Sequence, residues 1–553
     1  MSDPSAAPRT GRRAECPRRP GQGRRGRAAP RIAAGRFRGK GTRVGGGGDR
    51  LEFDHVVIGA GSAGCAAAAR LAEAGGTVAV LEAGPGERDP RVRVPFGLVW
   101  LMGSRRDWRR RTAPQAALGG RAVAVPRGRL VGGSGSINSM VWFRGRRDDW
   151  DAWGLPGWRW ADVEAEFEEV ERRVGPARLA DPHPLARAFG AAFGANDPGA
   201  PATPERQSAG ISHCNLVRGA RRSAADAFLR PAMAAGGVTL LTRAEVRCLL
   251  FEGRRATGAI LRDGRRVAAR GGVVLSAGAI ESPMILMRSG IGPAAHLRAH
   301  GIAVRIDAPG VGANLHDHPA VGLHFEGAGS GYGLTARQGP AWAGAPALWL
   351  AARRGRLASN TVEACAFLRL GEGDGPPEVQ THFVPFMLGW QGRAIVPGRE
   401  GYFADVCVCR PRSRGRLTMA DPDSPAIDPG LLSDPADLDV LVRGVERLRA
   451  VLAAAPFGTR RAPEAHPGAH VAGEALREHV RAACGTAYHP VGTLALNGPV
   501  TPEGRVRGAE ALWVADASVM PSITSANTNA PSMLIGWRIG GRAAAAAREG
   551  IAA

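Results

Sequence analysis

Three glycines with the spacing G-x-G-x-x-G, at Gly59, Gly61 and Gly64, directly follow a short run of β-branched residues. In this pattern the first glycine permits a tight turn, and the second lets a phosphate group approach the backbone. The third lets a helix pack close to the preceding strand. The free N–H groups and the positive dipole end at the start of that helix attract phosphate. The pattern therefore predicts a site that binds the pyrophosphate of a dinucleotide.

A strand, a helix and a second strand must position these glycines. The apolar residues 56–58 are typical of a buried strand, the alanine-rich segment 65–74 of a helix, and residues 77–81 of a second strand. Glu82 follows, and a carboxylate at this point can accept hydrogen bonds from the hydroxyls of an adenosine ribose. Its charge disfavours NADP. The motif alone does not separate FAD from NAD, and a plain strand–helix–strand unit is the structural alternative.

The N-terminal segment accounts for nearly half of the chain's charge. The 553 residues carry a formal net charge of +23, and residues 1–50 contain 14 Arg and Lys against 3 Asp and Glu, or +11. This segment is poor in apolar residues, so we predict that it is disordered. It could be a basic tail that touches nucleic acid or anionic surfaces, a transit peptide, or a stretch that precedes a true start near Val44. Nucleic-acid binding would depend on this tail alone, and we do not expect it.

The rest of the chain is long enough for more than one domain. It contains no apolar run of 18 or more residues, so no membrane span is predicted. The eight cysteines are scattered and form no C-x-x-C pair, which favours free thiols in a reducing compartment. We expect a cytoplasmic protein, with peripheral attachment to a membrane as an open alternative.

The pattern of residue types predicts an α/β fold (α+β overall). A Rossmann-like nucleotide-binding domain is discontinuous in sequence, and a substrate domain with an antiparallel sheet is inserted into it. The predicted divisions are a disordered basic tail at 1–50, nucleotide-binding parts at 51–150, 211–315 and 481–553, a cap segment at 151–210, and the substrate domain at 316–480. Within them we expect helices at 162–173, 223–234 and 437–454, a strand within 123–135, and irregular structure at 175–210.

Several longer blocks follow one another in a recognisable order. They are G-A-G-S-A-G at 59–64 with Glu82, R-G-R-L-V-G-G-S-G-S-I-N-S-M-V-W-F-R-G at 127–145, G-A-I-E-S-P-M-I-L-M-R-S-G-I-G at 278–292, G-V-G-A-N-L-H-D-H-P at 310–319, and Y-H-P-V-G-T, V-A-D-A-S-V-M-P and N-T-N-A-P-S at 488–493, 514–521 and 527–532. With these blocks the chain resembles the glucose–methanol–choline (GMC) oxidoreductases, flavoproteins that oxidise alcohols, and above all their choline-dehydrogenase-like branch. The resemblance spans about residues 51–545.

The resemblance, and not the spacing, selects FAD as the cofactor. It implies that the pyrophosphate and ribose are held by Gly59, Gly61, Ser62, Gly64 and Glu82, that the flavin is lined by Gly133, Asn138, Ser139, Met140 and Val141, that Val246 meets the adenine, and that Ala277, Gly278, Asp516 and Ala517 lie near the rest of the cofactor.

The resemblance also implies the chemistry. His489 occupies the position of the active-site histidine, and Asn529 is assigned to its partner position. An alcohol would be oxidised to an aldehyde or ketone by hydride transfer to flavin N5, with the histidine managing the hydroxyl proton, since its pKa lies near neutrality. An oxidase that uses O₂, and a lyase that merely retains FAD, are the alternatives. The electron acceptor and the particular alcohol stay open.

Three further positions qualify this interpretation. Some relatives attach FAD to a histidine in the second glycine-rich block, where this chain has Ile137, so we expect non-covalent FAD. The sequence His316-Asp317-His318 contains possible metal ligands, but no further ligand cluster accompanies it, and no metal is expected. Glu363 is a candidate carboxylate for the substrate cavity, where a choline ammonium group would also need aromatic faces.

Overall fold

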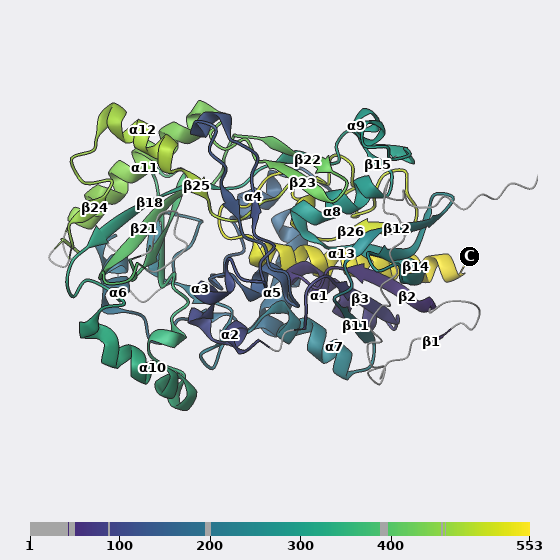
Figure 1. Ribbon diagram of the computed structural model, residues 1–553, viewed down its shortest axis with the longest axis horizontal. Coiled ribbons are helices and arrows are strands. Elements are labelled where there is room, and N and C mark those ends of the chain that lie inside the picture. The colour runs from purple at the N-terminus through teal and green to yellow at the C-terminus, as the bar shows by residue number, and fades with distance from the viewer. Residues whose placement is uncertain are drawn as a thin grey trace, which may run out of the picture.

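The computed structural model describes residues 42–43, 50–86, 89–193, 201–387, 396–454, 457–458 and 461–552. A mostly parallel sheet and an antiparallel sheet lie side by side, each covered by helices (Figure 1). This arrangement confirms the predicted α/β class. Of the predicted basic tail, only Thr42–Arg43 and Arg50 fall within the described residues, so the predictions for that segment otherwise lie outside them.

The first sheet is built around the glycine motif. Its strand order is β11-β3-β2-β14-β13-β12, with β1 paired to β2 and β26 paired to β14. Strands β11, β3, β2, β14 and β26 run parallel to one another, whereas β1, β13 and β12 pair antiparallel. The strands are β1 (Thr42–Arg43), β2 (Arg50–Ile58), β3 (Val78–Glu82), β11 (Val238–Thr242), β12 (Val246–Glu252), β13 (Arg255–Leu261), β14 (Arg266–Leu275) and β26 (Leu512–Val514).

The turn between β2 and α1 (Ser62–Glu73) has the predicted form. Gly59 has φ +102°, and a Cβ on Gly64 would lie 1.9 Å from the carbonyl oxygen of Gly59. Only glycine permits this close approach of helix and strand. The three consecutive elements at residues 50–82 therefore follow from local sequence.

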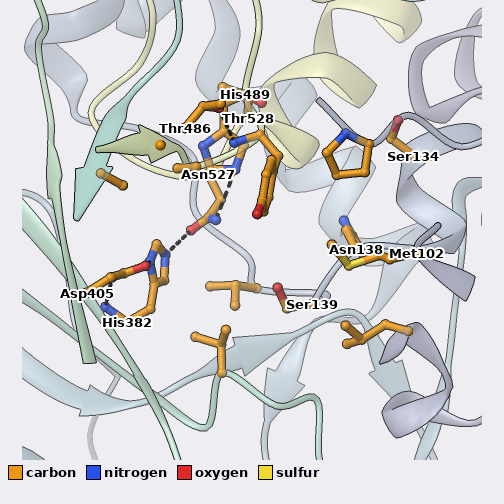
Figure 2. A pocket seen from close by; sticks show the side chains of 18 of the residues that line it. Met102, Ser134, Asn138, Ser139, His382, Asp405, Thr486, His489, Asn527 and Thr528 are labelled. Atoms are coloured by element: carbon orange, nitrogen blue, oxygen red, sulfur yellow. Dashed lines mark hydrogen bonds and ion pairs between the residues drawn. The ribbon is translucent and has the colours of Figure 1, made fainter. Parts of the chain in front are cut away.

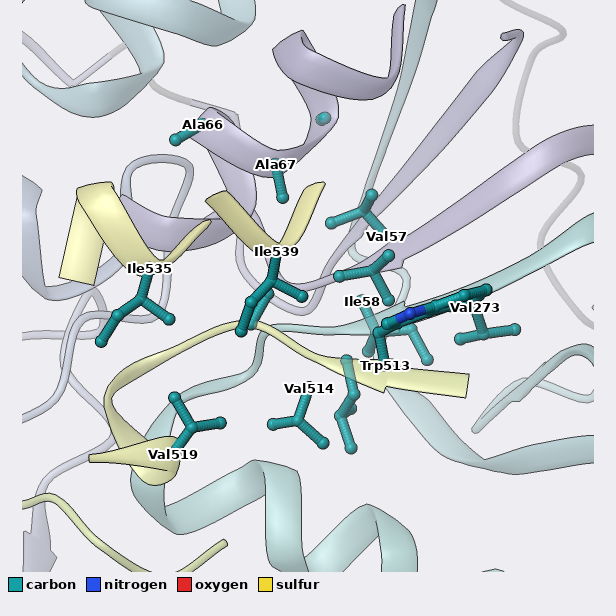
Figure 3. Packing of buried hydrophobic residues seen from close by; sticks show 14 of the residues in the cluster. Val57, Ile58, Ala66, Ala67, Val273, Trp513, Val514, Val519, Ile535 and Ile539 are labelled. Carbon is teal, nitrogen blue, oxygen red and sulfur yellow. The ribbon is translucent and has the colours of Figure 1, made fainter. Parts of the chain in front are cut away.

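The last helix, α13 (Asn529–Ala552), packs against α1. A Cβ on Gly536 would lie 2.1 Å from the carbonyl oxygen of Ala63, so the two helices are in backbone contact at this point. Ile535 and Ile539 are fully buried beside this contact (Figure 3). The packing brings the end of the chain to the glycine turn near its beginning.

The second sheet is antiparallel throughout. Its order is β24-β18-β21-β20-β19-β7, with β25 also paired to β18, and α11 packs against β18, β20 and β21. The elements are β7 (Ser208–Ile211), β18 (Pro319–Glu326), β19 (Ala364–Leu368), β20 (Val379–Val384), β21 (Gly401–Val408), β24 (Glu464–His466), β25 (Gly485–Thr486) and α11 (Pro435–Ala453). The helix expected at 437–454 is thereby confirmed.

The expectation of irregular structure at 175–210 was wrong. This segment contains α6 (Pro184–Ala192) and the start of β7, and α6 packs on β7 and β19. Pro184 suits the first turn of a helix, and Leu185 and Phe189 lie four residues apart on one buried face. Because the segment is rich in Pro and Ala, its short amphipathic pattern is not evident from the sequence alone.

Two other predicted elements are shorter or less regular than expected. The strand within 123–135 is reduced to β5 (Ala124–Val125). The helix expected at 223–234 begins as a π-helical turn at Ala225–Leu229 and continues as α7 (Arg230–Ala234). The domain boundaries stay a prediction. Strand β7 from the expected cap segment and β25 from the last expected part both belong to the antiparallel sheet.

The structure also contains the following helices and strands. The helices are α2 (Pro90–Arg93), α3 (Leu98–Leu101), α4 (Arg147–Asp151), α5 (Trp160–Val174), α8 (Gly278–Arg288), α9 (Ala294–Ala299), α10 (Gly339–Ala352) and α12 (Gly473–Ala483). The strands are β4 (Arg110–Arg111), β6 (Ala177–Arg178), β8 (His213–Cys214), β9 (Leu216–Val217), β10 (Ala220–Arg221), β15 (Ile291–Gly292), β16 (Ile306–Asp307), β17 (Ala313–Leu315), β22 (Gly415–Asp421) and β23 (Ser424–Asp428). In the described part of the chain, no helix is both long and apolar enough to cross a membrane.

The contact between α1 and α13 generates a stability prediction. Gly536→Ala should lower the melting temperature, because its Cβ would overlap the Ala63 carbonyl oxygen, and such overpacking costs about 1–3 kcal/mol. Gly541→Ala in the same helix is the matched control, since its Cβ would meet only the flexible side chain of Arg70, at 3.2 Å. Both changes gain the same helix propensity. Thermal unfolding of the two variants side by side measures the difference, and equal melting temperatures would contradict the close packing.

Candidate functional site

Two adjoining cavities lie along the ends of the parallel strands. We call the first the glycine cavity, since Gly59, Gly61, Gly133 and Gly278 line it, and the second the histidine cavity, since His489 lines it. Their shared wall consists of Ser62, Arg127, Ser134, Pro490, Ala517 and Ser532. An elongated ligand can therefore extend from one cavity into the other.

Most of the predicted cofactor residues line one of these cavities. Gly59, Gly61, Ser62, Glu82, Gly133, Val246, Ala277, Gly278, Asp516 and Ala517 line the glycine cavity, and Asn138, Ser139, Met140 and Val141 line the histidine cavity. Gly64 lines neither and instead holds α1 against β2. The structure thus brings together residues from five separate blocks of the sequence.

The glycine cavity has room for a phosphate group close to the backbone. A Cβ on Gly61 or Gly278 would meet no protein atom within 4 Å, so both glycines face open space. Gly61 is the N-cap residue of α1, and the positive end of the helix dipole lies at that point. A Cβ on Gly133 would come within 2.7 Å of Gly61 Cα, which shows how closely the second glycine-rich block approaches the first.

The carboxylate of Glu82 is buried beside this turn. It accepts hydrogen bonds from the backbone N–H groups of Ala60, at 3.0 Å, and Gly84, at 2.7 Å. Burial raises the pKa of Glu82 to about 7, although these two N–H donors and Arg129 oppose the shift. Each carboxylate oxygen has a further lone pair, so both retain the capacity to accept a hydroxyl hydrogen bond.

Asp516, which lines the glycine cavity, joins its own segment to the start of α8. Its carboxylate accepts hydrogen bonds from the N–H groups of Gly278 and Ser518, both at 2.8 Å, and from the Ser282 hydroxyl, at 2.6 Å. Burial raises its pKa. Asp516 therefore holds the start of α8 in place, and its effect on a ligand would be exerted mainly through that backbone.

A hydrogen bond from its backbone N–H group holds His489 in place. Its N–H donates to Asp317, at 2.8 Å, and the same carboxylate accepts from the His318 N–H and the Thr486 hydroxyl. Burial raises the pKa of Asp317 to about 6. The imidazole of His316 is likewise engaged, between the Asn314 carbonyl and the N–H of Ile523. These contacts give the sequence His316-Asp317-His318 a positioning function.

The hydrogen bonds around His318 determine the tautomer of His489. The Nε2 atom of His318 lies 3.1 Å from the Thr524 carbonyl oxygen, which only accepts, so Nε2 carries a proton. Burial lowers the pKa of His318 to about 4, so the ring is neutral and its Nδ1 is an acceptor. This Nδ1 lies 3.1 Å from His489 Nδ1, which must therefore donate. The remaining nitrogen of His489, Nε2, therefore carries no proton, and its lone pair can act as a base.

The partner of His489 is Asn527, and the assignment of Asn529 was wrong. Asn527 Nδ2 donates to His489 Nε2 at 3.2 Å (Figure 2). The Oδ1 atom of Asn529 instead accepts from the Ser62 hydroxyl at 2.7 Å, at the N-terminus of α1. Asn529 also lines the histidine cavity. The sequence N-T-N offers two asparagines two residues apart, and only their directions in space distinguish them.

A second imidazole faces Asn527 from the antiparallel sheet. His382 Nε2 lies 3.5 Å from Asn527 Oδ1, and His382 Nδ1 lies 3.0 Å from Asp405 (Figure 2). Burial opposes protonation of His382, but Asp405 raises its pKa above the ordinary value. Gln380 also donates to Asn527 Oδ1, at 3.1 Å, and so fixes the direction of the amide.

The one grouping with metal-ligand geometry among the described residues is His382, Asp405 and Cys407. His382 Nδ1 is already hydrogen-bonded to Asp405. Burial raises the pKa of the Cys407 thiol well above its usual value, which disfavours the thiolate that binds metals. The contacts of these side chains are those of an internal hydrogen-bonded cluster.

Glu363 does not face the substrate cavity as predicted. Its carboxylate accepts from the Ser359 hydroxyl, at 2.6 Å, and from the His183 N–H, at 2.5 Å. The side chain is fully buried, and burial raises its pKa to about 7. Glu363 is not among the described residues that line the glycine cavity or the histidine cavity. Glu363 directly precedes β19, and the sequence around it does not determine which way its side chain points.

Comparison with known proteins decides the family. The family model described as GMC oxidoreductase matches residues 53–320, and its C-terminal counterpart matches residues 411–536. An oxygen-dependent choline dehydrogenase of Rhizobium etli is 36% identical over 527 residues, covering 88% of this chain and 94% of that protein. The chain belongs to the GMC oxidoreductase family. This GMC oxidoreductase is also 34% identical to an alcohol dehydrogenase [acceptor] of Pseudomonas putida, over 87% of this chain and 94% of that protein.

Solved structures of GMC oxidoreductases share the fold. Pyridoxine 4-oxidase from Mesorbium loti superposes with a TM-score of 0.76 at 28% sequence identity, covering 90% of this chain and 99% of that chain. Formate oxidase superposes with a TM-score of 0.81 at 24% identity, covering 89% and 98%. GMC oxidoreductases depend on FAD. The open space at Gly61 and Gly278, the helix N-terminus and the Glu82 carboxylate fit its pyrophosphate and ribose.

The glycine cavity generates a binding prediction. Gly61→Ala should weaken FAD binding about tenfold or more, ~1.4 kcal/mol, because its Cβ would occupy the space expected for the pyrophosphate. The melting temperature of the FAD-free protein should not change, since the Cβ meets no protein atom. Gly64→Ala is the contrasting variant, whose clash with Gly59 should lower that temperature. FAD titration by flavin fluorescence measures the affinity, and an unchanged affinity of Gly61→Ala would contradict the assignment.

Proposed function

We propose that this protein oxidises an alcohol to an aldehyde or ketone in an FAD-dependent reaction. The observation that supports this proposal is the unprotonated Nε2 of His489, which faces the histidine cavity beside the amide of Asn527. A base and a hydrogen-bond donor at this spacing suit a hydroxyl group, whose proton must leave when the carbon gives up a hydride. FAD, when bound, supplies the hydride acceptor.

The protein's own residues manage the hydroxyl group. In the proposed complex the substrate oxygen lies between Asn527 Nδ2, which donates to it, and His489 Nε2, which accepts its proton. Protonation of His489 creates an imidazolium, and its Nδ1–H keeps its hydrogen bond to His318. Asn527 is held by Gln380 and His382, so the amide does not rotate away from the oxygen. Asp317 keeps the His489 backbone in place during this proton transfer.

We propose that FAD binds without a covalent bond. Ile137, at the position where some relatives carry the attachment histidine, is buried and lines the histidine cavity. A hydrocarbon side chain has no nucleophile that could form a bond to the flavin. The block at 127–145 contains no histidine.

The proposed cofactor domain comprises parts 51–150, 211–315 and 481–553, and the proposed substrate domain comprises 316–480.

The histidine cavity favours an uncharged, largely apolar alcohol over choline. Its only carboxylate among the described lining residues is Asp405, which already accepts from both the ring and the backbone N–H of His382. Arg127 adds a positive group to the wall. A quaternary ammonium ion would need a free carboxylate or an aromatic cage. The apolar lining includes Leu98, Met102, Val321, Val362, Val384 and Phe403.

Anaerobic reduction of the bound flavin tests the proposed reaction. Primary aliphatic and aromatic alcohols should bleach the flavin, and choline should do so with at least about tenfold lower kcat/KM, ~1.4 kcal/mol. A lyase that only retains FAD would show no bleaching with any alcohol. Re-oxidation by O₂ or by an artificial acceptor then distinguishes an oxidase from a dehydrogenase. Faster reduction by choline than by every uncharged alcohol would contradict the proposed substrate preference.

His489→Ala should slow flavin reduction by about 10²–10⁴-fold while FAD stays bound, because general-base catalysis is worth that much. Asn527→Ala should slow the same step by a smaller factor, since it removes a hydrogen bond to the oxygen and leaves the base. Asn529→Ala is the matched control for Asn527, because its Oδ1 faces Ser62 and not His489. Stopped-flow absorbance measures reduction directly. Wild-type rates in His489→Ala would remove this histidine from the mechanism.

The pH dependence of reduction follows from the pKa of His489. Burial, and then the neighbouring His318, His382 and Arg127, lower this pKa well below the usual value. The base is therefore unprotonated at neutral pH, and a fall in pH protonates it only below the ordinary histidine value of about 6.5. We expect the reduction rate to stay constant from about pH 8 to about pH 6.5 and to fall in more acidic solution. A half-maximal rate at about pH 7 or above would show that the proton acceptor is another group.

A further inference from the structure

Exposed large apolar side chains gather around helix α10. The described residues contain five such side chains, and Leu348 and Leu350 of α10 are 47% and 66% exposed. Trp100 and Leu334, at 48% and 44%, lie beside this helix. Trp100 contacts Phe96, whose ring lies 5.3 Å from that of Trp342 in α10, and Trp342 donates to the carbonyl of Gly333, next to Leu334. Only Met233, at 38%, lies elsewhere, on α7. We call the four grouped side chains, with the outer side of α10, the apolar ridge.

A single stripe attaches α10 to the protein. Its buried residues are Ala345 and Trp349, four positions apart, and Trp342 is partly buried on the same side. The Trp349 indole donates to the Gly219 carbonyl at 2.9 Å. The remaining positions are alanine, glycine, proline or leucine, with no charged residue in the whole helix. Surface helices normally carry polar residues on the outer side, so this composition indicates that something covers it.

The C-terminal end of the apolar ridge is basic, with the Arg353 guanidinium 4.0 Å from the centroid of the Trp349 ring and Arg354 beside it in the sequence. Residues 327–362 contain no Asp or Glu, and they contain Arg337 before α10 and Arg353, Arg354 and Arg356 after it. Arg337 forms an ion pair with Glu400, whereas Arg353 and Arg354 are exposed at the end of the helix. Apolar residues between arginines are complementary to a lipid surface, where acyl chains lie below negatively charged headgroups.

We propose that the apolar ridge docks onto an anionic lipid bilayer. The helix has 14 residues and is about 21 Å long, shorter than the ~30 Å hydrocarbon core, so it lies in the interface and does not span it. Leu348 and Leu350 lie on opposite flanks of the helix, each about 100° around the axis from buried Trp349, and together with Leu334 they border the acyl region. Trp100 lies at headgroup level, where tryptophan is favoured, and Arg353 and Arg354 contact lipid phosphates.

The ridge lies close to the histidine cavity. The chain passes from α10 through the 3₁₀ turn Arg356–Ala358 to Thr361 and Val362, which line that cavity. On the other side, Phe96 packs against Trp342, and Leu98, two residues further on, also lines it. A docked protein would therefore hold this end of the cavity near the lipid, where apolar molecules partition. The docking itself does not depend on which reaction the cavity supports.

Vesicle flotation of the FAD-loaded protein tests the proposal. The probes are vesicles of phosphatidylcholine alone and of phosphatidylcholine mixed with phosphatidylglycerol. The protein should float with the mixed vesicles, and Leu348→Glu/Leu350→Glu should lower the bound fraction about tenfold or more. Met233→Glu, at the exposed side chain on α7, is the matched control and should bind as the wild type does.

Charge is tested separately. Arg354→Glu should weaken flotation, and Arg447→Glu, on the exposed side of α11, should not. Circular dichroism and turnover of a water-soluble alcohol show whether the double leucine variant folds. If it does not fold, Arg354→Glu still tests the proposal.

Three outcomes would overturn the proposal: no flotation of the wild type with the mixed vesicles, equal flotation of Arg354→Glu and Arg447→Glu, or equal flotation of a folded double variant and the wild type. Light scattering without vesicles tests whether a second copy of the chain covers the ridge instead. Dimers that form in the wild type and are lost in Leu348→Glu/Leu350→Glu, without vesicle binding, would assign the ridge to a second copy of the chain.

Discussion

The backbone contact between α1 and α13 is the constraint on which the site depends. No side chain fits between Gly536 and the Ala63 carbonyl oxygen, and the Ser62 hydroxyl donates to Asn529 at the adjoining helix N-termini. The segment just before α13 carries Asn527, so its position relative to the glycine turn is set by this packing. The same contact places the N-terminus of α1, which can attract a phosphate group, next to the cavity that holds the His489 imidazole.

Burial accounts for most of the electrostatics at the site. The carboxylates of Glu82, Asp317 and Asp516 all have raised pKa values because burial disfavours their charge, and each is stabilised by N–H or hydroxyl donors of the protein. These groups connect loops from distant parts of the chain. Burial has the opposite consequence for His318 and His489, whose pKa values fall, and the result is a pair of neutral rings that hold one another in defined tautomers.

The second sheet contributes differently from the first. The parallel strands supply backbone at their ends, where glycine lets a ligand approach, whereas the antiparallel sheet supplies side chains such as His382 and Val384 that project into the histidine cavity. Helix α10, which carries the apolar ridge, lies at the edge of the molecule on the side of the second sheet (Figure 1). The histidine cavity and a candidate lipid contact are thus connected through one short segment, residues 353–362.

The sequence by itself determined the elements whose signals are local. The glycine spacing, the apolar strands at 50–82 and the periodicity at 437–454 predicted the turn, its flanking strands and helix α11, because each depends on neighbouring residues only. Most of the site residues that the family motifs predicted line one of the two cavities. Tertiary structure alone decided between Asn527 and Asn529, because their directions depend on where α13 meets α1. Only the tertiary structure showed that Glu363 does not line either cavity and that residues 184–192 form α6. Both depend on burial, and the burial of a side chain depends on what packs against it.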